Sequence, residues 1–149
     1  MKTYDLKTAY MRNPMGLDDL HPQLSWKTKD GKKQTAFKIE VSVNDKPWKL
    51  MEERRSDSMK TSYSLPLESR DRILWRAAVA DENGVYDSWS QPAFFEMGLL
   101  EKKEWKASFI MGNYEHSKSP KVRYPVDCFK KTFRIKKENL VRARLYITA

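Results

Sequence analysis

The chain has 149 residues, of which 40% are hydrophobic and 33% are charged, and its formal net charge is +9. This length allows one domain or two small ones, and no stretch of the sequence is long and apolar enough to span a bilayer as a helix. The single cysteine, Cys128, excludes an internal disulfide framework and is typical of a reducing compartment, so we expect a cytoplasmic protein.

The first part of the chain alternates short β-patterned runs with turn signals. Strands are predicted over residues 6–11, 23–28 and 37–43. The clearest is 37–43, because its apolar residues occur at every second position, from Phe37 to Val43. Residues 13–16 form a turn cluster with Pro and Gly, and Asp30-Gly31 predicts a hairpin-type turn.

The same kind of pattern continues to residue 98. Residues 44–60 are polar and mixed, which predicts a connection or a short edge strand around Trp48. Further strands are predicted over 62–67, 73–80 and 93–97. Alternate residues from Ile73 to Val79 share one apolar face, and Asn83-Gly84 tolerates the positive φ angles of a tight turn. Six or seven short strands at this spacing predict an all-β antiparallel sandwich.

The last third shows fewer elements. They are one helical turn within 99–106, an extended segment at 105–111, a loop at 112–125, and strands at 129–135 and 141–149. Three extended segments are stable only when their hydrophobic face is covered. In 141–149 apolar and polar residues alternate up to the final residue, although a strand needs neighbours for its backbone groups. We therefore expect poor order there, or self-association through this terminal strand.

The charge distribution changes near the same point. Residues 1–98 contain 16 Lys and Arg against 15 Asp and Glu, whereas residues 99–149 contain 13 against 5. This difference indicates two units of different character. We divide the chain into a β-sandwich at 1–98, a connection at 99–112 and the incomplete start of a second β-sandwich domain at 113–149.

The first unit resembles a fibronectin type III domain through Trp26, the run 75–79, the Asn83-Gly84 turn and the Trp-Ser-Gln-Pro sequence at 89–92. Ordered motifs along the whole chain are more specific. They are NPMGLD at 13–18, HPQLSW at 21–26, QTAFKI at 34–39, SWS at 88–90, FFEMGLL at 94–100 and WKA at 105–107. Together these motifs resemble the N-terminal region of bacterial α-L-rhamnosidases, which form glycoside hydrolase family 78.

This resemblance implies a large multidomain enzyme that hydrolyses terminal α-L-rhamnose from glycosides with inversion. It implies a fibronectin-like sandwich, then a jelly-roll-like β-domain, and further on an (α/α)₆ barrel that carries the catalytic carboxyls. In such relatives the segment like 141–149 runs on into the rest of the second domain. We therefore expect a non-catalytic N-terminal fragment, inactive by itself, whose partner is the remainder of the enzyme. The alternative is a stand-alone module that binds carbohydrate or protein.

Local groups offer little chemistry in place of the barrel. An inverting glycosidase needs an acid and a base about 6.5–9.5 Å apart, whereas Asp18-Asp19 and Glu52-Glu53 are adjacent pairs in loop-like sequence that we expect to be solvated. His21, His116 and Cys128 lack the spacing of a metal site, which needs about four ligands. We predict no catalytic residue, no metal and no cofactor, and we expect Cys128 to be a partly buried thiol.

The aromatic residues and the basic residues suggest two kinds of binding. Trp26, Trp75 and Trp89 fall at positions typical of core packing. Trp48, Tyr86 and Tyr114 fall in loops, and they are our candidates for contact with carbohydrate. Nucleic-acid binding would need a basic groove with interleaved aromatics. Tyr146 is the single aromatic residue beside Arg142 and Arg144, so we expect no nucleic-acid partner.

Overall fold

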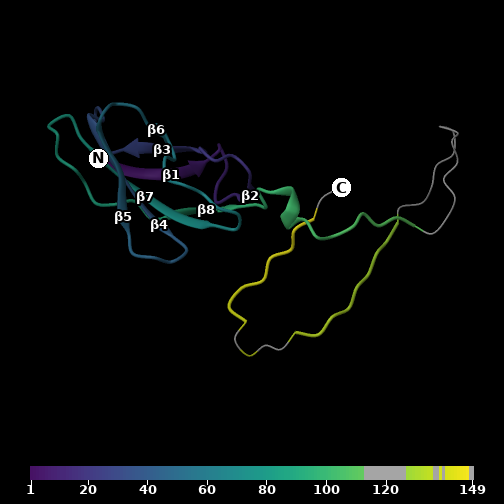
Figure 1. Cartoon of the computed structure of the whole chain (residues 1–149). Helices are drawn as coiled ribbons and strands as arrows, with labels where there is room; N and C mark the ends of the chain where they lie inside the picture. The colour runs from purple at the N-terminus through teal and green to yellow at the C-terminus, as the bar shows by residue number, and fades with distance from the viewer. Residues whose placement is uncertain (113–126, 136–137, 139, 148–149) are drawn as a thin grey trace, which may run out of the picture. The chain divides into compact units, whose positions relative to one another are not determined.

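The computed structural model describes residues 1–112, 127–135, 138 and 140–147 (Figure 1). The chain divides into two compact units, Met1–Trp105 and Lys106–Ala149. The first unit contains two β-sheets. The three-stranded sheet has the order β1 (Lys2–Thr8), β3 (Gln23–Lys29) and β6 (Lys60–Ser62). The five-stranded sheet has the order β2 (Met15–Leu17), β8 (Ala93–Met97), β7 (Arg72–Ala80), β4 (Ala36–Val43) and β5 (Lys49–Arg55).

Strand pairing is antiparallel throughout this unit except where β2 runs parallel to β8. The hydrophobic core lies between the two sheets and draws residues from both. Trp26 of β3 and Phe37 of β4 meet edge to face there, with ring centroids 5.1 Å apart. Each large side chain buried in this way contributes about 1.5–3 kcal/mol of hydrophobic stabilisation, so the core accounts for the two-layer arrangement.

The alternating patterns at 37–43 and 73–80 are confirmed. Phe37, Ile39 and Val41 of β4 are fully buried, and they lie opposite Val79, Ala77 and Trp75 of β7 in register. The strands predicted at 23–28 and 93–97 are also present as β3 and β8. The all-β class is therefore confirmed.

Several boundaries predicted from the sequence are wrong. β1 ends at Thr8, because Ala9 and Tyr10 adopt the left-handed backbone conformation and Met11 turns back to pair with Thr8. Asp30-Gly31 lies in a bend between two strands of different sheets, so it closes no hairpin.

The middle of the chain agrees with the prediction in one segment and departs from it in another. The 44–60 segment contains an edge strand, one of the two predicted alternatives, although this strand, β5, begins after Trp48 and has seven residues. The strand expected at 62–67 is the short β6, which ends before Tyr63. The backbone N–H of Tyr63 instead donates to the carbonyl of Pro22 at 3.0 Å.

The second unit contains no strand in its described residues, 106–112, 127–135, 138 and 140–147. The strand predicted at 129–135 and the part of the strand predicted at 141–149 that is described, 141–147, are thus not formed, because an extended segment holds strand geometry only when a neighbour satisfies its backbone groups. Residues 148–149 and the predicted loop at 112–125 beyond residue 112 lie outside the described residues. Val141 and Leu145 are 94% and 85% exposed. Cys128 is exposed rather than partly buried. Just before this unit, the predicted helical turn is present as a 3₁₀ helix, η1 (Lys102–Glu104).

Candidate functional site

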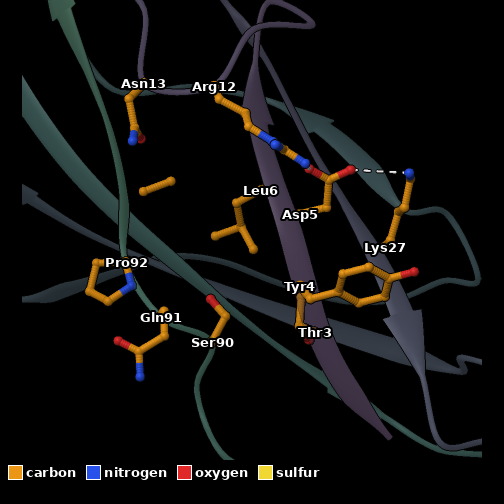
Figure 2. Close-up of a pocket in the computed structure, with 11 residues that line it drawn as sticks. Thr3, Tyr4, Asp5, Leu6, Arg12, Asn13, Lys27, Ser90, Gln91 and Pro92 are labelled. Atoms are coloured by element: carbon orange, nitrogen blue, oxygen red, sulfur yellow. Dashed lines mark hydrogen bonds and ion pairs between the residues drawn. The ribbon is translucent and has the colours of Figure 1, made fainter.

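A pocket of about 530 Å³ lies beside β1. Its walls come from β1, from the turn after β1, from Lys27 of β3 and from the 90–93 segment that leads into β8. Figure 2 shows Asp5 between Arg12 and Lys27, with the ring of Tyr4 beside them. The lining is mixed, with amide, hydroxyl and charged groups next to the apolar atoms of Leu6 and Pro92.

A β-bulge places the acidic group of this pocket. The register between β1 and β3 shifts between Tyr4 and Lys7, and Asp5 has a φ angle of 50°, in the left-handed region. A bulge inserts an extra residue and redirects a side chain. Leu6 consequently enters the core, while the Asp5 carboxylate turns toward the cations on the outer side of the sheet.

Three cations surround the carboxylate of Asp5. Arg12 donates to Oδ1 through Nη2 at 2.6 Å and through Nε at 2.8 Å. The Nζ atoms of Lys27 and Lys7 lie 3.1 Å and 4.0 Å from Oδ2. These contacts, led by the hydrogen bond from Arg12, lower the pKa of Asp5 below its ordinary value of 3.8. Because one carboxylate faces three cations, the cluster keeps an excess of positive charge and suits an anionic ligand.

The outer face of the five-stranded sheet carries Trp48, the first carbohydrate candidate. The Arg76 guanidinium lies 4.5 Å from the centroid of the Trp48 ring and 4.9 Å from that of Trp89. Arg76 also forms an ion pair with Glu40 at 2.6 Å. Trp48 is 36% exposed. A cation therefore covers part of its π surface, and its contact with sugar stays a prediction.

Tyr86, the second candidate, has a similar environment. The Nζ atom of Lys38 lies 4.3 Å from the centre of its ring, and its hydroxyl donates to Oε1 of Glu53 at 3.4 Å. Partial burial and the neighbouring Glu53 raise the pKa of Tyr86 above its ordinary value of 10.0. Tyr86 and Trp48 thus flank the same polar sheet face. The third candidate, Tyr114, lies outside the described residues.

Three of the four carboxylates in the adjacent acidic pairs have a partner of their own. Asp19 accepts a hydrogen bond from the backbone N–H of His21 at 2.8 Å. Glu52 and Glu53 lie on β5 rather than in a loop, and successive residues of a strand point to opposite faces. Glu52 accordingly accepts from the Thr61 hydroxyl, while Glu53 pairs with Lys38. Neither geometry converges on one substrate bond. Within the described residues, no group of three or more His, Cys, Asp or Glu is arranged to hold a metal ion.

The cluster around Asp5 was missed by the sequence analysis. Asp5, Lys7 and Arg12 are close in the chain but Lys27 is not, and the bulge that brings them together leaves no periodic signal. The one available sign was the irregular order of apolar and charged residues between Tyr4 and Lys7. Among the described residues, no helix has the length and apolar character needed to cross a membrane.

Two packed, mainly antiparallel sheets around one core define an immunoglobulin-like β-sandwich. Residues 3–101 match the family described as the Rha78A-like, N-terminal immunoglobulin domain, and the chain belongs to this family. The likeness to fibronectin type III domains in particular stays a prediction.

Similar proteins carry the name α-L-rhamnosidase. One from Alteromonas sp. (strain LOR) is 33% identical over 152 residues, which cover 92% of this chain and 16% of that protein. Another, from Streptomyces avermitilis, is 29% identical over 123 residues, which cover 76% of this chain and 12% of that protein. The chain thus spans less than a fifth of the length of these relatives.

Two solved structures of α-L-rhamnosidases also superpose on this chain. The α-L-rhamnosidase from Dictyoglumus thermophilum superposes with a TM-score of 0.65 at 27% identity, over 72% of this chain and 13% of that one. The Streptomyces avermitilis α-L-rhamnosidase in complex with L-rhamnose gives a TM-score of 0.63 at 28% identity, over 71% of this chain and 11% of that one. The resemblance to α-L-rhamnosidases that the motifs indicate is confirmed.

Proposed function

We propose that this chain is the non-catalytic N-terminal part of an α-L-rhamnosidase-like glycoside hydrolase. The observation that carries the proposal is the match of residues 3–101 to the N-terminal domain family, together with relatives named α-L-rhamnosidase of which the chain spans only 12–16%. The acid and base of the reaction would then lie elsewhere in the enzyme, on a catalytic barrel that is the partner of this region.

The surroundings of the local carboxylates support this assignment. Asp5 is held by Arg12 and Lys27, and Glu53 is held by Lys38. A general acid needs a raised pKa, whereas the pKa of Asp5 is lowered. We infer that the sandwich supports and orients the barrel, and that the second unit is completed by segments of the same enzyme. In this proposal the boundaries are 1–98, 99–112 and 113–149, and a cytoplasmic location fits the single cysteine.

The first experiment assays the 149-residue chain alone on p-nitrophenyl α-L-rhamnopyranoside. We expect no release of nitrophenol above the buffer rate, because the described residues of the chain provide no convergent acid and base. The Streptomyces avermitilis α-L-rhamnosidase serves as the positive control. Turnover by the isolated chain, lost on Asp5→Asn, would contradict the non-catalytic assignment.

The second experiment tests the supporting role in a chimera. The region of the Streptomyces avermitilis enzyme that matches residues 3–101 is deleted in one variant and replaced by those residues of this chain in another. We expect the deletion to lower the melting temperature and the activity, and the replacement to restore most of both. A deletion variant as stable and as active as the intact enzyme would refute the role.

A further inference from the structure

The outer side of the three-stranded sheet carries a set of basic residues that the proposed function does not use. We name as the basic face the residues Lys2, Lys7, Arg12, Lys27, Lys29 and Lys60. Register partners in a sheet share one face. Lys2 lies opposite Lys29, Tyr4 opposite Lys27, and Lys60 opposite Ser25, which also faces Lys7. Cations from all three strands therefore project to the same side, and Arg12 joins them through Asp5.

Three of these six cations share a single carboxylate. Asp5 is the carboxylate that contacts Lys7, Arg12 and Lys27. Within the part of the chain that the structure describes, no ion pair joins Lys2, Lys29 or Lys60 to a carboxylate. The Lys29 ammonium instead lies 5.8 Å from the centre of the Tyr4 ring. Like charges directly opposite each other destabilise a sheet, so the Lys2–Lys29 pair is unfavourable for folding.

The other sheet of the same sandwich is organised differently. On its outer face Lys38 pairs with Glu53 at 3.2 Å and Arg76 pairs with Glu40 at 2.6 Å. Residues 1–98 are nearly neutral as a whole. The positive excess of the basic face is therefore a local segregation of charge, unrelated to the basic character of the last third.

The pocket beside β1 opens next to this face and adds groups that suit a sugar. Arg12 and Lys27 line it together with the amides of Asn13 and Gln91 and the ring of Tyr4. The Oδ1 atom of Asn13 accepts from the backbone N–H of Phe94 at 3.0 Å, which fixes the amide with its NH₂ group as the remaining donor. Amides and an aromatic ring beside cations can bind hydroxyls, a sugar face and an anionic group at once.

We propose that the basic face and its pocket bind an anionic oligosaccharide, one whose sugars carry carboxylate or sulfate groups. The proposal rests on the proposed function, because a glycoside hydrolase acts on sugar chains, and it narrows these chains to anionic ones. Charge complementarity selects the anion, and the pocket lining selects the sugar. Nucleic acid is disfavoured, since single-strand binders interleave several aromatics with their cations and Tyr4 is the aromatic ring that the described register places on this face.

The test measures binding of the full 149-residue chain by isothermal titration calorimetry. The probes are an oligogalacturonate, which is carboxylated, a heparin-derived oligosaccharide, which is sulfated, a neutral galactan oligomer and a short DNA duplex. We expect saturable, salt-dependent binding of at least one acidic glycan and none of the neutral oligomer. The ranking of the two acidic glycans identifies the anionic group.

Matched variants locate the binding. Lys2→Gln/Lys27→Gln/Lys29→Gln removes charge from the basic face, and we expect affinity to fall by about tenfold or more with a shallower salt dependence. Lys46→Gln/Lys49→Gln/Lys102→Gln removes the same charge from exposed positions elsewhere, and we expect a change of less than about twofold. All six residues are exposed, and circular dichroism confirms that each variant is folded.

The inference is overturned by an equal loss of glycan affinity in both triple variants, by no binding of either acidic glycan, or by tighter binding of DNA than of glycan. Each of these results leaves the rhamnoside assay and the chimera unaffected. A failure of the basic face is thereby distinguishable from a failure of the proposed function.

Discussion

Two buried hydroxyls in the sandwich should respond in opposite directions to their removal. Tyr63 is fully buried, packs edge to face on Phe95 with centroids 5.5 Å apart, and has no hydrogen-bond partner for its hydroxyl among the described residues. Thr8 is 1% exposed, and its Oγ1 accepts a hydrogen bond from Nε1 of the buried Trp75 at 3.0 Å. Tyr63→Phe deletes an unpaired polar atom, whereas Thr8→Val leaves an indole N–H unpaired.

The magnitudes follow from the cost of desolvation. An unpaired buried hydroxyl or N–H costs about 1–3 kcal/mol. We expect Tyr63→Phe to increase the free energy of unfolding by about 1 kcal/mol, which raises the melting temperature by about 4–8 °C in a domain of this size. We expect Thr8→Val to decrease it by about 1–3 kcal/mol, although both changes preserve the shape of the side chain.

The pH dependence gives an independent check. Burial, helped by the nearby Asp71, raises the pKa of Tyr63 to about 12 from an ordinary value of 10.0. Below pH 10 both states keep the proton, so stability is unaffected by this group. Above pH 10 the unfolded state loses the proton first, and stability falls by up to about 1.4 kcal/mol per pH unit until the folded pKa is reached. Tyr63→Phe should remove this alkaline loss.

The assay is urea unfolding of the wild type and both variants, followed by tryptophan fluorescence and circular dichroism from pH 7 to about 11. A clear loss of stability in Tyr63→Phe would refute the reasoning, because it would mean that the hydroxyl has a partner such as a buried water. So would an unchanged midpoint for Thr8→Val.

Three further predictions concern the core, the aromatic face and the second unit. Gln34 is buried, accepts from Nε1 of Trp26 at 3.1 Å and donates to the carbonyls of Ser56 and Ser58. Gln34→Ala should therefore lower the free energy of unfolding by about 2–3 kcal/mol. Gln91→Ala, at an exposed position, is the control and should leave the urea midpoint unchanged. Similar midpoints for the two variants would contradict a stabilising role for the hydrogen bonds of Gln34. If Trp48 contacts sugar, Trp48→Ala should weaken rhamnoside binding in a fluorescence titration by about fivefold, the equivalent of about 1 kcal/mol of stacking. Trp105→Ala, at a similarly exposed position, is the control, and an equal effect of both changes would remove Trp48 from the candidates. The exposed apolar residues of the second unit should promote self-association of the chain. Leu145→Lys should therefore lower the weight-average mass in sedimentation equilibrium relative to the wild type. A wild-type chain that stays monomeric at high concentration would count against self-association.

Part of the candidate site could be predicted from the sequence, and part could not. Trp48 and Tyr86 were selected because they fall between predicted strands, and both flank one sheet face. Their stacking with Arg76 and Lys38 could not be predicted, because it depends on the register between β4, β5 and β7. The Asp5 cluster could not be predicted from the sequence for a related reason, because a single extra residue in β1 turns the carboxylate toward cations from other segments.

The sequence by itself determined the class, the family resemblance and the buried faces of the central strands. A period of two along β4 and β7 is a local property that survives in any β-sandwich, so Phe37, Ile39 and Trp75 could be assigned to the core in advance. Tertiary structure alone decided which strands pair. Asp30-Gly31 predicts a hairpin, yet β3 pairs with β1 and β6 while β4 pairs with β5 and β7. Pairing depends on contacts between residues distant in sequence, such as the hydrogen bond that Nε1 of Trp75 donates to Oγ1 of Thr8. Such contacts leave no periodic trace in either partner.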